Sequence, residues 1–127
     1  MAQNIFDSLS ADSKARIIQE FVPGKQVTLA HIIANPDQSL YAKLGLDPTV
    51  DYRRSAIGII NVTPAETTII AGDIATKASG VQLGFVDRFS GTLIVTGTVS
   101  EAEAAMNAIV DYAQSVLGFA VCPITKT

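Results

Sequence analysis

Cysteine and histidine, which can serve as a nucleophile and its base, occur once each in this chain, as Cys122 and His31. A thiol beside an imidazole base is a recognised nucleophilic pair, so a small enzyme using these residues is one hypothesis. We favour a structural interpretation, a hydrogen-bonded histidine in a strand and a small buried cysteine, because each lies in an apolar segment. One cysteine cannot form an internal disulfide, and one histidine with one cysteine cannot build a His/Cys metal cluster. We therefore expect no metal and no other cofactor.

Two carboxylates, Glu101 and Glu103, lie close enough in sequence to suggest acid–base chemistry. They follow Ser100, and the order Ser-Glu-Ala-Glu is a capping box that predicts the start of a helix. Negative charge in a first helical turn also interacts favourably with the helix dipole. The pair is therefore explained without catalysis, and we expect the protein not to be an enzyme.

The composition restricts the possible partners. The chain has 127 residues, enough for one domain, with 48% hydrophobic and only 17% charged residues. Its net charge of −3 provides no attraction for a phosphate backbone, so nucleic acid is not an expected partner. No apolar run reaches the roughly 18 residues that a membrane-spanning helix needs, and the N-terminal residues do not read as a secretory signal. These features predict a cytosolic protein that buries apolar surface against other subunits.

Three helices are predicted from start and stop signals. Thr63-Pro64-Ala65-Glu66 is a capping box with proline at the first helical position, which predicts a helix over 64–79 that ends at Gly80. The box from Ser100 to Glu103 predicts a second helix over 101–117 with Gly118 as its stop. A shorter helix is expected after Asn35-Pro36, ending at Gly45.

Apolar runs rich in β-branched residues predict strands over 27–33, 56–62, 81–86 and 93–99, and a fifth, edge strand over 119–124 that contains Pro123. Residues 87–91 join two of them as a hairpin turn in which Gly91 takes a positive φ, and 47–55 form a loop. The predicted fold class is α+β, an antiparallel sheet with the two main helices on one face plus a short third helix. A sheet of this type ordinarily receives its last strand after the second long helix, whereas here the strong candidate, 27–33, comes first. That order suggests a circular permutation.

Several stretches also resemble a known family: IIQEFVPGKQVTLAHIIANP (17–36), AIGIINVTPAE (56–66), AGDIATKA (71–78), GFVDRFSGTLIVTG (84–97) and the terminal ITKT. They are similar to the circularly permuted hexameric shell proteins of bacterial microcompartments, over residues 17–127. The resemblance implies a non-catalytic subunit with a BMC fold. Its hexamers would tile into the shell around metabolic enzymes in the bacterial cytoplasm, with itself, other shell proteins and encapsulated enzymes as partners.

The resemblance also assigns roles to residues. The turn Asp87, Arg88, Phe89, Ser90 and Gly91 matches the family's loop at the six-fold axis, so these residues would line a pore, which is sometimes capped. Lys77, with Asp73 on the same helix, matches the family's edge lysine. Asn35 stands where ordinary shell hexamers place an arginine at that hexamer edge.

The chain divides into an N-terminal extension, 1–23, and a permuted shell domain, 24–127. A strand near 16–23, with Ile17, Ile18, Gln19, Glu20, Phe21 and Val22, is expected to form a small six-stranded barrel over the pore. The alternative to a shell subunit is a small-molecule-binding regulatory α+β domain that acts as a trimer or dimer. Such a domain needs a pocket with convergent polar groups, and the sequence indicates none.

Overall fold

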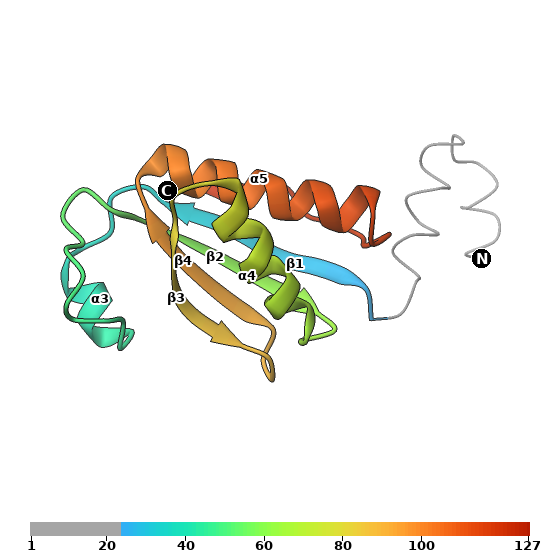
Figure 1. Ribbon diagram of the computed structural model, residues 1–127, viewed down its shortest axis with the longest axis horizontal. Helices are drawn as coiled ribbons and strands as arrows, with labels where there is room; N and C mark the ends of the chain where they lie inside the picture. Colours follow the sequence, from blue (N-terminus) through green and yellow to red (C-terminus); the bar gives the residue numbers. More distant parts are fainter. Residues whose placement is uncertain (1–23) are drawn as a thin grey trace, which may run out of the picture.

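The structure is a computed structural model that describes residues 24–127, and it contains one sheet with helices on both faces (Figure 1). Along the chain the elements are β1 (Gln26–Ile33), α3 (Ser39–Lys43), β2 (Ala56–Thr63), α4 (Thr67–Ala78), β3 (Gln82–Asp87), β4 (Thr92–Gly97), α5 (Val99–Ser115) and β5 (Thr125–Lys126). The strand order in the sheet is β3-β4-β2-β1-β5. The predicted α+β fold class is confirmed, with β1 beside β2 although the two are separated in sequence by α3 and a long loop.

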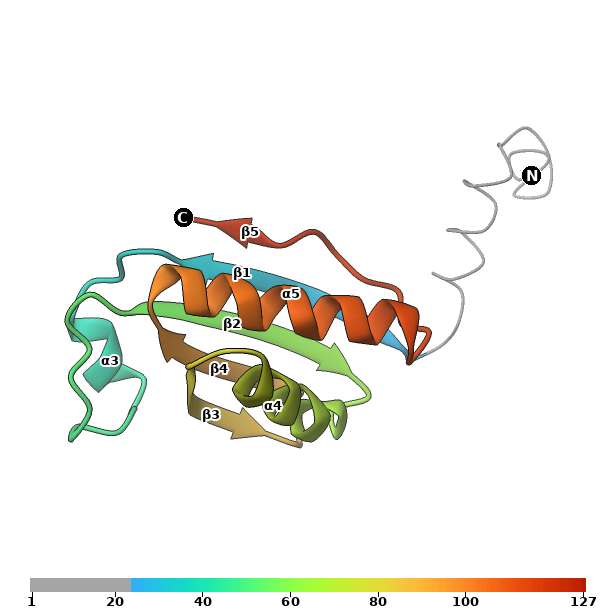
Figure 2. The ribbon, with the colours of Figure 1, turned by 45° about the horizontal axis from the view of Figure 1, so that its top comes forward.

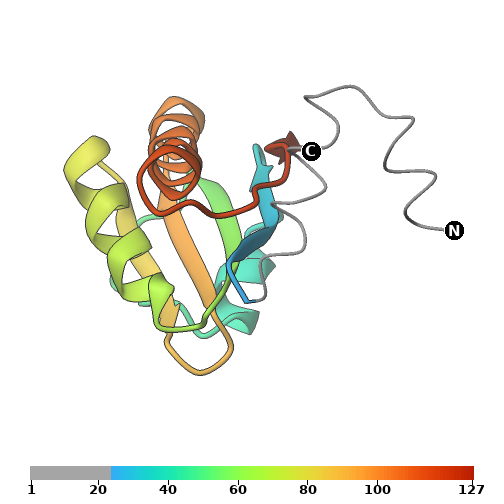
Figure 3. The ribbon, with the colours of Figure 1, turned by 90° about the vertical axis from the view of Figure 1, so that its right-hand side faces the viewer.

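The strand pairing directs alternate residues of β2 to two different cores. Ile60 pairs with Ala30 and Leu93, and all three lie in the core that also contains residues of α4 and α5. Both long helices lie on the same side of the sheet (Figure 3). Ile57 and Ile59 face the opposite side of the sheet, which we call the open face. Helix α3 covers one end of the open face, where Tyr41 and Leu46 pack on Ile57 and Ile94. The loop over 47–55 is confirmed as irregular, and its Tyr52 stacks on Tyr41 with ring centroids 4.2 Å apart.

The two long helices lie on one face of the sheet, as predicted, but both begin at other residues (Figure 2). Helix α4 starts at Thr67 rather than at Pro64, and no side chain caps it. The predicted box at Thr63 does not form because β2 continues through Thr63, which pairs with Gln26. Helix α5 starts at Val99.

The capping box of α5 uses Thr98 and Glu101 instead of Ser100 and Glu103. The Thr98 hydroxyl accepts a hydrogen bond from the Glu101 amide at 3.1 Å, and the Glu101 carboxylate accepts one from the Thr98 amide at 2.9 Å. Thr98 is extended, with ψ 162°, because it directly follows β4. Both tetrapeptides fit the capping pattern, and the end of the strand decides which one is used.

Two more predictions, the residue that ends α4 and the position of the last strand, differ from the structure. Gly45 and Gly118 follow their helices with φ +72°, as predicted, whereas α4 ends through an extended Ser79 and Gly80 has no positive φ. The expected strand over 119–124 is wrong: Ala120 makes a single bridge to Gln26, and β5 is the short pair Thr125–Lys126. Since β5 runs parallel to β1, the sheet is mixed rather than antiparallel. Pro123 has no N–H to donate, which prevents a continuous strand there.

The C-terminal residues are held on β1 by His31. Its two ring nitrogens lie 2.6 Å from the hydroxyl of Thr125 and 2.9 Å from that of Thr127. The Thr127 amide donates to the Ile32 carbonyl at 2.9 Å. The prediction of a hydrogen-bonded structural histidine is therefore confirmed. None of the helices within 24–127 has the length and apolar character that crossing a bilayer requires.

Gly91 is required by conformation and by space. Its φ is +80°, and an added Cβ would overlap the carbonyl oxygen of Val62. Gly118 has φ +72° with nothing within 4 Å of such a Cβ, so it isolates the cost of conformation. We expect Gly91→Ala to lower the free energy of unfolding by at least about 2 kcal/mol, and Gly118→Ala by about 1 kcal/mol. Urea denaturation of both variants measures the difference, and equal losses would contradict the role given to Val62.

Candidate functional site

The turn that joins β3 to β4 is held by hydrogen bonds among three of its own residues. The Asp87 carboxylate accepts a hydrogen bond from the Phe89 amide at 2.9 Å, and the Gly91 amide donates to the Asp87 carbonyl at 2.9 Å. Gly91 has the positive φ predicted from the sequence. An aspartate at the first position and a glycine near the last are typical of such turns, and together they fix its backbone.

The end of β2 anchors this turn to the sheet. The Val62 amide donates to the Gly91 carbonyl at 2.9 Å. The side-chain amide of Asn61 donates to the Ser90 carbonyl and to the Thr92 hydroxyl, both at 3.2 Å. Sequence reasoning missed Asn61, and its one signal was an amide side chain in an otherwise apolar strand. The turn is thus fixed from both ends.

Hydrogen bonding also sets the charge of the turn. Hydrogen bonds from the Ser90 side chain and from the Phe89 amide hold the pKa of the Asp87 carboxyl below its ordinary value, since both stabilise the charged form. Asp87 is therefore ionised at neutral pH. It carries one negative charge at the base of the turn, next to the positive charge of Arg88.

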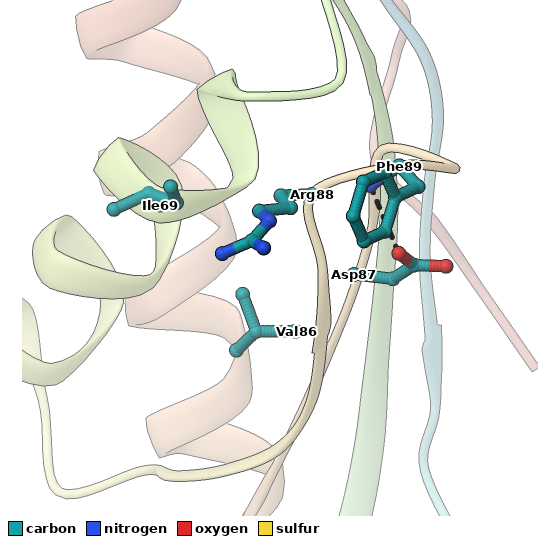
Figure 4. A pocket seen from close by; sticks show the side chains of 5 residues that line it. All are labelled: Ile69, Val86, Asp87, Arg88 and Phe89. Atoms are coloured by element: carbon teal, nitrogen blue, oxygen red, sulfur yellow. Dashed lines mark hydrogen bonds between the residues drawn. The ribbon is translucent and has the colours of Figure 1, made fainter.

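A shallow hollow of about 270 Å³ lies between the turn and α4, lined by Ile69, Val86, Asp87, Arg88 and Phe89 (Figure 4). Arg88 extends toward α4, and its guanidinium lies 5.0 Å from the centre of the Phe89 ring, a cation–π distance. Phe89 is 81% exposed, an unusual value for so large an apolar side chain. Sequence reasoning missed Ile69 and Val86 as lining residues, because their common surface depends on how α4 packs on β3.

The residues predicted at a hexamer edge lie in two places. Lys77 and Asp73 are brought together near the end of α4, with the Lys77 Nζ atom 2.8 Å from the Asp73 carboxylate. Asn35 is exposed in the connection between β1 and α3, a separate segment. The ion pair is exposed, so it contributes at most a few tenths of a kcal/mol to stability and leaves Lys77 accessible to another molecule.

The residues considered for catalysis have structural partners. Both nitrogens of His31 are engaged by threonine hydroxyls, and burial raises the pKa of the Cys122 thiol, which disfavours the reactive thiolate. Glu101 caps α5, and Glu103 accepts a hydrogen bond from Lys126 at 2.9 Å. No cluster of three or more metal-ligating side chains occurs within residues 24–127. The arrangement offers a rigid turn and exposed apolar surface rather than reactive groups.

Comparisons with known proteins match this architecture. The BMC domain family model matches residues 56–125. The chain therefore belongs to the BMC domain family. Within it, the chain is 52% identical to the bacterial microcompartment shell protein PduU of Salmonella typhimurium, over 88% of this chain and 93% of PduU. It is 49% identical to the shell protein EutS of Escherichia coli K12, over 90% of this chain and 98% of EutS.

A solved structure titled "CutR flat hexamer, form 1" superimposes with a TM-score of 0.76 and 44% identity, over 86% of this chain and 96% of that one. Another, titled "CutR Screw, form 2 with 33.8 angstrom pitch", gives a TM-score of 0.73 at 42% identity, over 81% of this chain and all of that one.

The pKa of Asp87 gives a prediction for the turn. Because the folded pKa is depressed, the stabilisation from the ionised carboxylate is complete above the ordinary aspartate value of 3.8 and is lost as the pH falls below it. We expect a carboxyl ¹³C NMR titration to give a midpoint for Asp87 below 3.8, and Ser90→Ala to move that midpoint upward. An unchanged midpoint in Ser90→Ala would contradict the assigned role of the Ser90 side chain.

Proposed function

We propose that this chain is a structural subunit of a bacterial microcompartment shell, whose copies close into hexameric rings around the β3–β4 turn. The observation that carries the proposal is 44% identity, over 86% of this chain, to a protein whose solved structure is titled a flat hexamer. The relatives named shell proteins match nearly their whole length. The subunit then resides in a shell within the bacterial cytoplasm, with other shell proteins and encapsulated enzymes as further partners.

Absence of catalysis is part of the proposal. The relatives are named as shell proteins, which implies a structural role. The hydrogen bonding of His31 and the raised pKa of Cys122 support the same conclusion, because the hypothetical pair lacks both a free base and a ready thiolate.

We also propose that the shell domain is circularly permuted. The BMC match begins at residue 56, with the first residue of β2. Strand β1 lies before that match in sequence, yet it pairs with β2 along seven residue pairs inside the sheet. An element outside the matched segment thus completes the fold. The division into an extension, 1–23, and a domain, 24–127, follows. The proposed pore-capping residues Ile17, Ile18, Gln19, Glu20, Phe21 and Val22 lie outside the described residues.

The pore-lining role of the turn is proposed from its resemblance to the family's loop at the six-fold axis, and its geometry supports the proposal. A backbone fixed at both ends can present the same atoms six times around an axis with little variation, as a pore requires. Ser90 and the exposed Phe89 would lie nearest to the axis, and Arg88 and Asp87 would add alternating charges around it. The exposed Lys77, with Asp73 and with Asn35, is proposed to contact the neighbouring hexamer.

The regulatory alternative has less support. A hollow of about 240 Å³ with a charged lining includes Arg53, Arg54 and Glu101. Arg53 already pairs with Asp51 at 2.9 Å, and Glu101 is used by the capping box of α5. Arg53 and Glu101 are thus engaged by other groups of the protein and are not directed together toward a ligand.

The solution mass tests the ring. Six copies of the 13.4 kDa chain give about 80 kDa by light scattering after size exclusion. We expect that mass for the native chain and for Lys77→Ala, while Lys77→Ala alone fails to form extended sheets at high concentration. Lys43→Ala, a change on α3 away from the pair with Asp73, is the control and should assemble like the native chain. A native mass of two or three chains would favour the regulatory alternative.

A cysteine in the β3–β4 turn tests whether the turn lies at the axis of the proposed ring. In a Cys122→Ser background, Ser90→Cys places one thiol per subunit beside the proposed pore. We expect a short bismaleimide to link subunits within the 80 kDa ring in this variant. The control is Asp111→Cys, exposed on α5, which should not link within the ring. An intact ring in which Ser90→Cys gives no linkage would place the turn away from the axis.

A further inference from the structure

Strand β1 contains a bulge at Thr28. Val27 pairs with Val62, and the next pair in the register is Leu29 with Asn61. Since Val62 and Asn61 are adjacent in β2, Thr28 is an extra residue with no residue opposite it. Two exposed residues, Thr28 and Leu29, therefore follow one another in β1, and the alternation of the strand shifts by one position.

The packing of β1 does not require this extra residue. Val27 and Ala30 belong to the core under α4 and α5, and Leu29 is opposite Asn61, whose side chain lies on the open face. Without Thr28, the sequence from Val27 through Leu29 to Ala30 would alternate between the two faces as in a regular strand. A bulge disrupts the ladder of hydrogen bonds locally. A bulge where regular alternation would serve the core therefore indicates that Thr28 itself has a role.

The Thr28 side chain is directed at Asn61. Its hydroxyl donates to the Asn61 side-chain oxygen at 3.0 Å, and the Asn61 backbone carbonyl oxygen lies 3.4 Å from the same hydroxyl. Bulges commonly re-aim a side chain beside a functional site in this way. Both acceptors belong to one residue, so the Thr28 hydroxyl serves to hold Asn61.

The nitrogen of the Asn61 side chain holds the β3–β4 turn. It donates to the Ser90 carbonyl and to the Thr92 hydroxyl, both at 3.2 Å, which uses both of its N–H groups. The reverse orientation of the amide would place its oxygen against the Ser90 carbonyl oxygen, and two acceptors cannot form a hydrogen bond. The amide therefore has one favourable orientation, in which its oxygen faces Thr28 and its nitrogen faces the turn.

We infer that Thr28 and Asn61 are positioning residues for the β3–β4 turn, and that Thr28 acts through Asn61. The bulge brings the Thr28 hydroxyl to the Asn61 oxygen, and the amide held in this way keeps the Ser90 carbonyl at the sheet. Neither residue belongs to the turn. The connection links the turn to the first residues of β1, the strand that follows the extension over 1–23. The positioning concerns a single chain, and only its value for a pore rests on the proposed function.

Hydrogen exchange of the turn, measured by mass spectrometry on a peptide covering residues 87–92, tests the inference. Thr28→Val keeps the shape of the side chain and removes its hydroxyl, and Asn61→Ala removes the amide. We expect each variant to keep the native solution mass. Each should raise the exchange rate of the protected turn amides, such as that of Gly91, about five-fold, the change that the loss of one hydrogen bond produces.

Two comparisons separate positioning from a general effect on stability. If Thr28 acts through Asn61, the double variant should exchange in the turn no faster than Asn61→Ala alone. The segment in which β1 pairs with β2 at His31 and Ile59 should keep its native exchange rates. Thr76→Val is the matched control, because the Thr76 hydroxyl bonds to carbonyls within α4, and it should leave the turn unchanged.

Deletion of Thr28 tests the argument from the bulge. The remaining residues of β1 alternate regularly, so we expect the deletion variant to fold with a urea midpoint at or above the native one. Its turn should nevertheless exchange about as fast as in Thr28→Val, because the same hydroxyl is gone. An unfolded deletion variant would contradict the role given to the bulge.

The outcomes distinguish this inference from the proposed function. Native exchange of the turn in Thr28→Val would overturn the inference, and so would faster exchange spread over the whole sheet. Faster exchange in the double variant than in Asn61→Ala would show that Thr28 acts by another route. A variant that loses the native mass would also count against it, since the effect would then lie in assembly. A native chain that forms no ring would instead contradict the proposed function.

Discussion

The pairing of β2 with β1 on one side and β4 on the other is the constraint on which the rest of this structure depends. Because strand side chains alternate, this central strand sends Ile60 and Val62 toward α4 and α5, and Ile57 and Ile59 toward the open face. A shift of one residue in register would exchange these two sets and separate both cores from their helices. The end of the same strand also holds the β3–β4 turn, through Asn61 and Val62. One strand thus sets the two cores and the candidate pore.

The two long helices cover only one face of the sheet, and this determines which apolar surfaces the subunit exposes to other molecules. Helices α4 and α5 cover one face, whereas α3 covers only an end of the other. Leu29 and Phe85 therefore stay exposed on the open face, while Ile69 and Leu83 stay exposed where α4 meets the edge strand. A monomer with these surfaces is incomplete, which agrees with a family whose members build shells.

Sequence reasoning was accurate where a local signal has one structural solution, and less accurate where neighbouring signals compete. Gly91 takes the positive φ expected of it, Gly45 and Gly118 follow their helices as expected, and the four main strands appear within two residues of their predicted bounds. Helix starts were displaced because two capping patterns overlap at Thr98 and Ser100, and because β2 extends through Thr63. The last strand moved from 119–124 to 125–126, since pairing with His31 and Ile32 on β1 is a tertiary property that local β-propensity does not encode.

The sequence by itself determined the α+β class, the position of the turn at 87–91, the apolar excess and the resemblance to shell proteins, because each depends on residue types at short spacing. Only the tertiary structure decided the rest. It placed β1 beside β2, and it brought Asn61 to Ser90 and the C-terminal threonines to His31. It also divided the exposed apolar residues between two sides of the sheet. The physical reason is that strand partners, and the face on which each side chain emerges, are set by contacts between segments far apart in the chain, which no local pattern specifies.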